Sequence, residues 1–397
     1  MKNAKQRMLY VEGNLDGTIG GSYFSLLFLV AGLDRTRFEP IVVFATPNSL
    51  LPRFEAAGVR TLIVPPAEPG KAFAGSVIAK ALNFFRGFVL EPWRLARILK
   101  RERIDLVHLN NSIRRNHPWM LAARLRGVPC ITHERGINLG FKPRDRKLAH
   151  GLRSVICISG AVRDNFVERG LGDLPLVTIY NGLDPAQMQV TRSAEDVRSE
   201  IGVAPQTRLV GIVGNIKPWK GQEVVVRAMG LIARDFPNVT CVLIGDTSPN
   251  ETFYREQITA LARELGVEGQ VRITGFRSDV ANYINALDVQ IHASIEPEPF
   301  GRVLLEGMAL SKPLAASNGG AVPEIVVHGD TGLLFEPGNP QALADALRSL
   351  LAEPARALAM GMAGRTRLES DFSIRRNIEL TQELYDRLLN RQERMNS

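Results

Sequence analysis

Two glutamates, Glu298 and Glu306, flank a Pro-Phe-Gly turn in the segment ASIEPEPFGRVLLEGMA, residues 293–309. A strand-like run, Asp288–Ser294, leads into this turn, and a short apolar helix is expected to begin near Phe300. Ligands of open parallel sheets bind beyond the carboxyl ends of the strands, where the free N–H groups of a helix N-terminus attract a diphosphate. A carboxylate is a poor partner for phosphate but accepts hydrogen bonds from sugar hydroxyls. The segment therefore predicts a site for a sugar nucleotide.

A second segment, VGIVGNIKPWKGQEVVVRAM (residues 210–229), joins a strand-like run to a helical one. The backbone of its turn, Gly214–Gly221, can approach a diphosphate, and Lys220 supplies a point charge. The spacing is not that of GxGxxG, so it gives no support to a dinucleotide site. Taken alone, Lys220 would be a solvated surface lysine; beside a sugar-nucleotide site, it is expected to bind phosphate.

The glutamate segment resembles the signature of family-four retaining glycosyltransferases of GT-B fold. That signature reads Glu, Pro or Gly, Phe-Gly, four variable residues and Glu, and its specific elements here are Glu298, Phe300, Gly301 and Glu306. The resemblance implies that Glu306 holds the nucleotide ribose and that Glu298 holds the transferred sugar. We therefore expect a hexosyltransferase that uses a nucleotide-diphosphate sugar and retains the anomeric configuration.

The phosphate-binding turn departs from the family pattern at one position. The family has an Arg and a Lys that clamp the phosphates; Lys220 matches the Lys, but Asn215 stands in the place of the Arg. Lys217 is expected to restore the missing charge, unless the donor binds differently. The substitution leaves open an alternative, a catalytically impaired sugar-nucleotide-binding or scaffolding subunit of the same fold.

Two further donor contacts follow from the resemblance. The backbone around Phe276 and Arg277 is expected to meet the base, which does not reveal which base it is. Gly20 and Gly21, at the start of a helix, resemble the loop that faces the donor phosphates across the cleft, although a tight turn without a ligand explains them equally well. Gly319 and Gly320 are expected to serve a turn.

The acceptor side is predicted in the first half of the chain. His133 follows a strand in CITHERG and matches the family's Thr-x-His position, where a neutral imidazole could orient the incoming hydroxyl or contact the donor sugar. We predict Glu298, Lys220 and His133 as the catalytic residues. Arg114, Arg115 and Arg135 are the candidates for holding an anionic acceptor.

Strand-like and helical runs alternate along the whole chain, which is typical of α/β proteins with parallel sheets. We expect the GT-B fold: two Rossmann-like doubly wound parallel-sheet domains facing across a cleft. The N-terminal acceptor domain comprises residues 1–186 plus a returning helix in 372–397, and the C-terminal donor domain comprises 187–371, with a polar linker at 184–205. Thirteen strands are expected, at Met8–Glu12, Pro40–Ala45, Thr61–Val64, Asp105–Leu109, Val128–Thr132, Ser154–Ile158, Leu176–Ile179, Arg208–Val213, Thr240–Gly245, Val271–Gly275, Val289–Ala293, Pro313–Ala316 and Gly332–Phe335.

Composition and charge narrow the class of protein. The 397 residues are too many for one core and fit two domains. We expect no secretion leader, and the longest apolar run, Tyr23–Leu33, is shorter than the roughly 20 residues of a membrane span, so we expect a cytoplasmic protein. Up to residue 190 there are 27 Lys and Arg against 15 Asp and Glu, and from residue 191 there are 22 against 26. A basic first half indicates an anionic partner, and without nucleic-acid-binding motifs we expect a glycan or lipid-linked acceptor or a membrane surface.

Residues 84–103, FFRGFVLEPWRLARILKRER, combine aromatic and basic side chains. Arg94, Arg97 and Arg101 would share one helical face, with Trp93, Ala96 and Leu99 along another. Such a helix can lie on an anionic bilayer, which would bring the protein to the inner face of the plasma membrane. The alternative is a helix packed on the sheet with its cations solvated.

The absence of metal-binding motifs bears on the chemistry expected of this enzyme. There is no Asp-x-Asp and no cluster with metal-ligand spacing, so we expect no metal and no cofactor beyond the nucleotide sugar as co-substrate. Lys220, Lys217 and helix amides would then neutralise the departing diphosphate. The product is expected to be a surface polysaccharide or lipopolysaccharide. A phosphorylase or epimerase on the same fold would instead turn over without a glycan acceptor.

Overall fold

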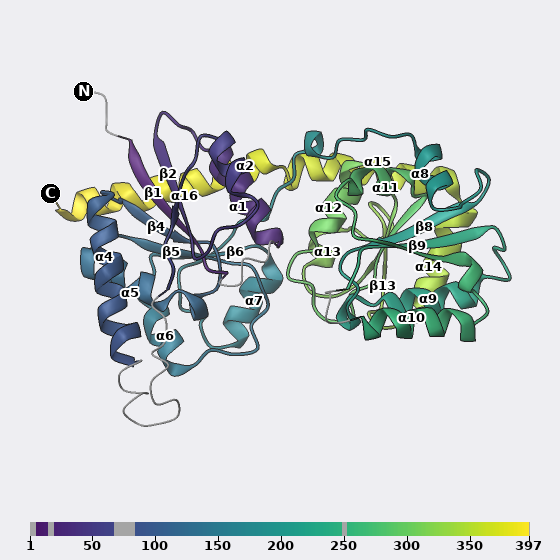
Figure 1. Cartoon of the computed structure of the whole chain (residues 1–397), viewed down its shortest axis with the longest axis horizontal. Helices are drawn as coiled ribbons and strands as arrows, with labels where there is room; N and C mark the ends of the chain where they lie inside the picture. Colours follow the sequence, from purple (N-terminus) through teal and green to yellow (C-terminus); the bar gives the residue numbers. More distant parts are fainter. Residues whose placement is uncertain (1–4, 15–19, 67–83, 248–251, 397) are drawn as a thin grey trace. The chain divides into compact units, whose positions relative to one another are not determined.

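The computed structural model describes residues 5–14, 20–66, 84–247 and 252–396, with side chains described up to residue 390. The chain divides into two compact units (Figure 1). The first unit contains the residues up to 181 and those from 374 onward, and the second contains residues 182–373. These boundaries lie within a few residues of the expected 186 and 372.

The first unit is built on a seven-stranded parallel sheet in the order β3-β2-β1-β4-β5-β6-β7. Its core includes apolar residues of β1 and β2 packed against α1 and α16. Its strands are β1 (Gln6–Glu12), β2 (Phe38–Phe44), β3 (Arg60–Ile63), β4 (Leu106–Leu109), β5 (Cys130–Glu134), β6 (Ser154–Cys157) and β7 (Leu176–Thr178). Its helices are α1 (Gly21–Gly32), α2 (Leu51–Ala56), η1 (Arg86–Leu90), α4 (Glu91–Arg101), η2 (Ile113–Arg115), α5 (His117–Arg126), α6 (Pro143–Ala149), α7 (Gly160–Glu168) and α16 (Ile374–Asn396).

The second unit has a six-stranded parallel sheet in the order β10-β9-β8-β11-β12-β13. Its strands are β8 (Arg208–Val213), β9 (Val239–Ile244), β10 (Val271–Gly275), β11 (Val289–His292), β12 (Leu314–Ser317) and β13 (Leu333–Phe335). Its helices are η3 (Pro185–Gln187), α8 (Ala194–Glu200), η4 (Pro218–Lys220), α9 (Gln222–Ile232), α10 (Phe253–Glu264), η5 (Glu268–Gln270), α11 (Val280–Ala286), α12 (Arg302–Ala309), α13 (Val322–Ile325), α14 (Pro340–Ala352) and α15 (Pro354–Asp371).

Strand order in each sheet reverses at one point, between β1 and β4 in the first unit and between β8 and β11 in the second. The loops that leave two such strands diverge to opposite sides and open a crevice, which is where doubly wound sheets bind ligands. In the second unit these loops carry Lys220, after β8, and Glu298, after β11. Side-by-side pairing of β8 and β11 therefore brings together two motifs that are 78 residues apart.

The predicted α/β architecture with two parallel sheets is confirmed, and each of the thirteen expected strands is present with ends shifted by no more than two residues. The expected returning helix is α16, which belongs to the first unit and runs on to Asn396. The linker prediction was wrong in part. Residues 184–205 contain η3 and α8, where Ser193 caps α8 by accepting a hydrogen bond from the Asp196 N–H and Val197 is fully buried.

None of the helices in the described ranges combines the length and apolar character needed to cross a bilayer.

Candidate active site

Lys220 and Glu298 form the centre of the candidate donor site in the second unit. The Lys220 Nζ donates to Glu298 Oε2 at 2.7 Å and also lies 3.9 Å from the centre of the Trp219 ring. Gly221, which follows, has φ +73°, and a Cβ there would lie 1.9 Å from the Ala293 carbonyl oxygen. Only glycine therefore allows the turn after β8 to pass so close to the end of β11, where the glutamate segment starts.

Three donors converge on the same oxygen of Glu298. Besides Lys220, Ser294 Oγ lies 3.0 Å and His292 Nε2 lies 3.3 Å from Glu298 Oε2, and Ser317 Oγ lies 3.2 Å from His292 Nδ1. Burial raises the pKa of Glu298, but the His292 hydrogen bond and the Lys220 charge outweigh it and hold the pKa at about 2. Glu298 is thus an anion, with one oxygen occupied by the protein.

The backbone of Glu298 is also fixed. Ala321 N donates to Glu298 O at 2.8 Å, and a Cβ on Gly320, whose φ is +60°, would lie 2.2 Å from that oxygen. Gly320 was expected to serve a turn; the structure adds a close approach that presses it directly against the glutamate.

The other residues of the glutamate segment make further contacts within the second unit. Gly301 has φ +88° and caps α12, while Phe300 is buried and meets Phe372 edge-on at 6.4 Å between ring centres. Glu306 accepts from Arg302 Nε at 3.2 Å on the same helix, and burial raises the pKa of Glu306 despite that partner. Neither this Arg302 pairing nor the contacts of His292 and Ser294 with Glu298 were predicted from the sequence.

The remaining donor candidates lie on loops at the carboxyl ends of the strands. Asn215 has an exposed side chain, and its carbonyl accepts from Gln222 Nε2 at 3.0 Å. Lys217 caps η4 and is half-buried. Phe276 is 77% exposed after β10, whereas the neighbouring Arg277 is engaged with Glu200 at 3.2 Å.

In the first unit, Gly20 caps α1 and Gly21 begins it. A Cβ at either position would meet nothing within 4 Å, so packing in this structure does not require glycine there.

His133 lies at the end of β5 and is almost completely buried. Its Nδ1 is 3.3 Å from Arg135 Nη2, which can only donate, so Nδ1 accepts and the proton of the neutral ring lies on Nε2. The Nε2 has no hydrogen-bond partner in the described part of the chain. Burial, followed by the charge of Arg135, holds the pKa of His133 well below its ordinary value, so the ring is neutral.

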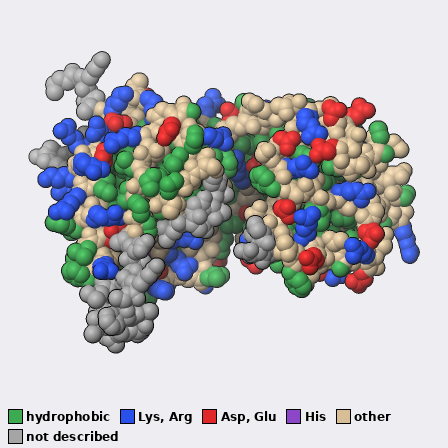
Figure 2. Space-filling model, viewed as in Figure 1, with side chains coloured by type: hydrophobic (Ala, Val, Ile, Leu, Met, Phe, Trp, Pro, Cys, Tyr) green, Lys and Arg blue, Asp and Glu red, His purple; other side chains and the backbone are tan. Residues whose placement is uncertain are grey.

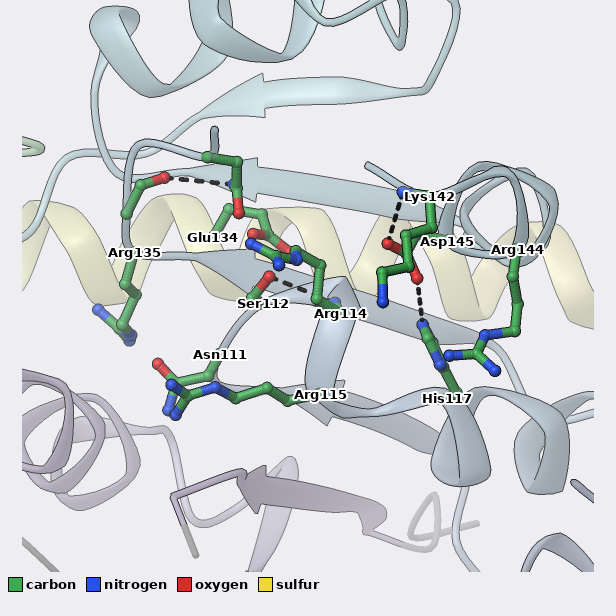
Figure 3. Close-up of a pocket in the computed structure, with 12 residues that line it drawn as sticks. Asn111, Ser112, Arg114, Arg115, His117, Glu134, Arg135, Lys142, Arg144 and Asp145 are labelled. Atoms are coloured by element: carbon green, nitrogen blue, oxygen red, sulfur yellow. Dashed lines mark hydrogen bonds and ion pairs between the residues drawn. The ribbon is translucent and has the colours of Figure 1, made fainter. Parts of the chain in front are cut away.

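The three predicted acceptor arginines play different parts. Arg114 and Arg115, on η2, extend into a cavity of about 470 Å³ at the carboxyl ends of β4 and β5 (Figure 3). Arg135 lines the same cavity, but its guanidinium is bound to Asn110 at 2.7 Å and Asn181 at 2.9 Å. Arg135 therefore chiefly joins the ends of β4 and β5 to residue 181.

Sequence reasoning missed much of this cavity. His117, Asn138, Lys142, Arg144 and Asp145 also line it. The run Lys-Pro-Arg-Asp-Arg-Lys at residues 142–147 was a signal that could have been read as a basic helix start beside the two arginines.

The aromatic and basic segment 84–103 forms η1 and α4, but its faces differ from those expected. Ala96 and Leu99 are buried against the fold, whereas Trp93 is 55% exposed, with Arg97 stacked over its ring at 3.6 Å. Arg94 is paired with Glu91 at 2.6 Å. The apolar surface left open therefore runs over Phe84, Phe85, Val89, Leu90 and Trp93.

Within the described ranges, no group of three or more His, Cys, Asp or Glu is arranged to hold a metal ion. The three cysteines, Cys130, Cys157 and Cys241, are buried free thiols.

Two parallel-sheet units, each with polar side chains at the point where its strand order reverses, are the architecture of GT-B enzymes. Residues 19–187 match glycosyltransferase family 4, and residues 193–367 match the family described as glycosyl transferases group 1. The chain therefore belongs to the family-four type of GT-B glycosyltransferases, and the prediction of an enzyme of the hexosyltransferase class is confirmed at the level of family.

The sequence identity to the following individual proteins is low. The chain is 25% identical over 301 residues to N-acetyl-alpha-D-glucosaminyl L-malate synthase of Bacillus anthracis, covering 74% of this chain and 77% of that protein. It is 27% identical over 217 residues to the lipopolysaccharide core biosynthesis mannosyltransferase LpcC of Rhizobium leguminosarum, covering 55% of this chain and 61% of that one, so it spans less than two thirds of that relative's length. The structure of Anabaena HepE in complex with UDP and glucose matches 96% of this chain and 99% of its own with a TM-score of 0.80 at 23% identity, which supports the fold.

Proposed function

We propose that this enzyme transfers a hexose from a nucleotide-diphosphate sugar to a glycan or lipid-linked anionic acceptor during surface polysaccharide or lipopolysaccharide synthesis. The observation that carries the proposal is the buried Lys220–Glu298 pair at the point where the strand order of the second sheet reverses. A cation suited to phosphate and a carboxylate suited to sugar hydroxyls are held there 2.7 Å apart.

The second unit would bind the donor. Lys220 and Lys217 would face the diphosphate with the amides at the start of α12, and Glu298 would accept hydroxyls of the sugar through the oxygen that Lys220 does not use. Glu306 would hold the ribose after exchanging its contact with Arg302, and the exposed Phe276 loop with Arg277 would meet the base. HepE, which has the same fold, is described in complex with UDP and glucose, which makes a uridine diphosphate sugar the first donor to test.

Chemistry would proceed without a metal and with retention of configuration. Lysine ammonium and helix amides would stabilise the departing diphosphate, which would in turn help to deprotonate the acceptor hydroxyl. His133 would contribute its unpartnered Nε2–H as a neutral hydrogen-bond donor to the sugar or to the incoming hydroxyl. Its depressed pKa argues against a role as a cationic acid.

The first unit would bind the acceptor, with Arg114 and Arg115 meeting its anionic part and Arg135 holding the site together. Two relatives favour this acceptor class, since one is named for L-malate, an anion, and the other for lipopolysaccharide core synthesis. We also propose peripheral contact with the inner face of the plasma membrane through residues 84–103, where five exposed apolar side chains accompany cations.

A thermal-shift panel of UDP-glucose, UDP-N-acetylglucosamine and GDP-mannose tests the donor assignment. A donor at 100 times its Kd should stabilise the wild type by about 2.7 kcal/mol, and Lys220→Gln or Glu306→Ala should abolish this shift. Glu256→Ala, an exposed acid on α10, is the matched control and should keep it. If the thermal shift is unchanged in both site variants, the donor does not bind at this site.

A second assay separates the enzyme from the scaffolding alternative that Asn215 suggests. The donor that binds best is incubated with the protein, and hydrolysis of the sugar–phosphate bond is followed. Donor binding without hydrolysis, together with hydrolysis in the Asn215→Arg variant, would favour the impaired subunit.

A further inference from the structure

The cavity after β4 and β5 is bounded by cations from two separate segments (Figure 3). Arg114 and Arg115 come from η2, while Lys142 and Arg144 come from the start of α6. At about 470 Å³, the cavity is of the size that accepts a small ligand.

These cations are not neutralised by the fold. In the part of the chain that the structure describes, Arg114, Arg115, Lys142 and Arg144 form no ion pair with a carboxylate. Arg144 instead lies over the Phe88 ring at 4.7 Å. Four such charges around one hollow raise its potential and attract an anion.

The two carboxyl groups that line the cavity are already engaged. Asp145 accepts from the Lys142 backbone N–H at 2.8 Å and lies 2.9 Å from His117 Nε2. Glu134 Oε1 accepts from Ile113 N at 2.7 Å, and burial raises the pKa of this carboxyl. Both acids thus anchor the loops that carry the cations, and two carboxyl groups against these four cations leave the lining of the cavity net positive.

We infer that this cavity binds a phosphate ester, and that the ester is the anionic group of the acceptor, an assignment that rests on the proposed function. A carboxylate is planar and is satisfied by one guanidinium fork, whereas a phosphate presents three oxygens and up to two charges to donors from different sides. Cations that arrive from η2 and from α6 suit the second geometry. Lys142 and Arg144 become specificity-determining residues in addition to the two arginines.

Isothermal titration of the full chain with glycerol phosphate, without any nucleotide, tests the site. We expect saturable binding at low ionic strength that weakens at least about tenfold in Lys142→Gln and again in the double variant with Arg114→Gln. Lys147→Gln is the control because Lys147 is exposed on the same helix, α6, and does not line the cavity. Binding that is absent in the wild type, or unchanged in the double variant, overturns the inference.

Two matched probes test the chemistry. Glycerate, the corresponding carboxylate, should bind at least about tenfold more weakly than glycerol phosphate, and glycerol should not bind. Equal affinity for glycerate would reject a phosphate site. Lys220→Gln should leave glycerol phosphate binding intact; if it abolishes binding, the anion sits in the donor site of the second unit, and the inference falls.

The source of the phosphate is resolved with vesicles. Phosphatidic acid and phosphatidylglycerol vesicles are compared at matched surface charge. A preference for phosphatidic acid that the double variant loses indicates a lipid-borne ester, and glycerol phosphate binding without that preference indicates a soluble one; either supports the site. The double variant should bind the donor as tightly as the wild type does. A negative result for the phosphate site can therefore be told apart from a negative result for the donor site.

Discussion

The ammonium of Lys220 donates to the carboxylate of Glu298 at 2.7 Å, with both side chains largely buried. Removing one partner of a buried ion pair leaves a charge without compensation, which costs more than an exposed pair contributes. The pair keeps the Glu298 carboxylate ionised and holds both side chains in place.

Glu298→Gln should make stability less dependent on pH in the acid range. The pKa of Glu298 is about 2, below its ordinary 4.5, so the stability that its ionised form contributes is complete above pH 4.5 and is lost as the pH falls towards 2. A depression of this size corresponds to about 3 kcal/mol. Urea unfolding at several pH values should show the largest difference between wild type and variant near pH 7, and little difference near pH 2.

The matched control is Glu256→Gln, which removes an exposed acid from α10. Its unfolding free energy should follow that of the wild type throughout. If the gap between Glu298→Gln and the wild type stays constant from pH 7 to pH 3, the loss reflects packing, and the charged network around Glu298 is not stabilising.

Gly320→Ala should be far more damaging than Gly329→Ala. Both glycines have positive φ, +60° and +82°, so both alanines suffer backbone strain of about 1–2 kcal/mol. Only at Gly320 would the new Cβ also collide with backbone, 2.2 Å from Glu298 O and 2.5 Å from Glu298 N. Thermal unfolding should show a modest loss for Gly329→Ala and a loss several kcal/mol larger, with a weakened donor shift, for Gly320→Ala; equal losses would contradict the close approach.

A buried hydrogen-bonded network connects α16 to the sheet of the first unit. Tyr385 Oη lies 3.0 Å from Tyr10 Oη and 2.6 Å from His108 Nδ1. Tyr385→Phe breaks both contacts and leaves two buried polar atoms unpaired, at a cost of about 2–4 kcal/mol, while Tyr10→Phe breaks one and should cost about 1 kcal/mol. Burial lowers the pKa of His108 to about 3, so this difference should be constant between pH 5 and pH 8 in chemical denaturation. A larger loss in Tyr10→Phe would show that the network is not organised around Tyr385.

The strands of this fold could be predicted because parallel strands buried on both faces are runs of apolar residues bounded by turns. Arg208–Val213, whose four central residues are buried, is an example in which the predicted and observed ends coincide. The region 184–205 was mistaken for a linker because α8 is seven residues long and polar on its surface, and only Val197 and its cap reveal it. Short helices stabilised by tertiary contacts leave little signal in the sequence.

The site was predictable where chemistry depends on a local motif, and not where it depends on partners distant in sequence. Glu298 and Lys220 were found from their own segments, but their contact depends on the pairing of β8 with β11. Arg135 was predicted to bind the acceptor, and nothing in its segment indicated that Asn110 and Asn181 would occupy most of its donors.

Membrane contact would depend on exposed aromatic and aliphatic side chains at one end of the first unit. Figure 2 shows Lys and Arg side chains outnumbering acids on the visible face of this unit, while the second unit carries both signs interspersed. Phe85 and Trp93 are about half exposed, and the Arg97 guanidinium over Trp93 can remain in contact with anionic head groups as the ring enters the interface.

Flotation with anionic liposomes at low salt should therefore recover the wild type, and the double variant Phe85→Ser, Trp93→Ser should stay with the soluble fraction. Leu358→Ser, with Leu358 58% exposed on α15 of the second unit, is the control and should float like the wild type. Raising the salt to 0.5 M should weaken binding, because the Debye length then falls to about 4 Å and the contribution of Arg97 and its neighbours is screened. If the wild type fails to float at low salt, the membrane contact is rejected. Segment 84–103 is then a helix packed on the sheet, with solvated cations.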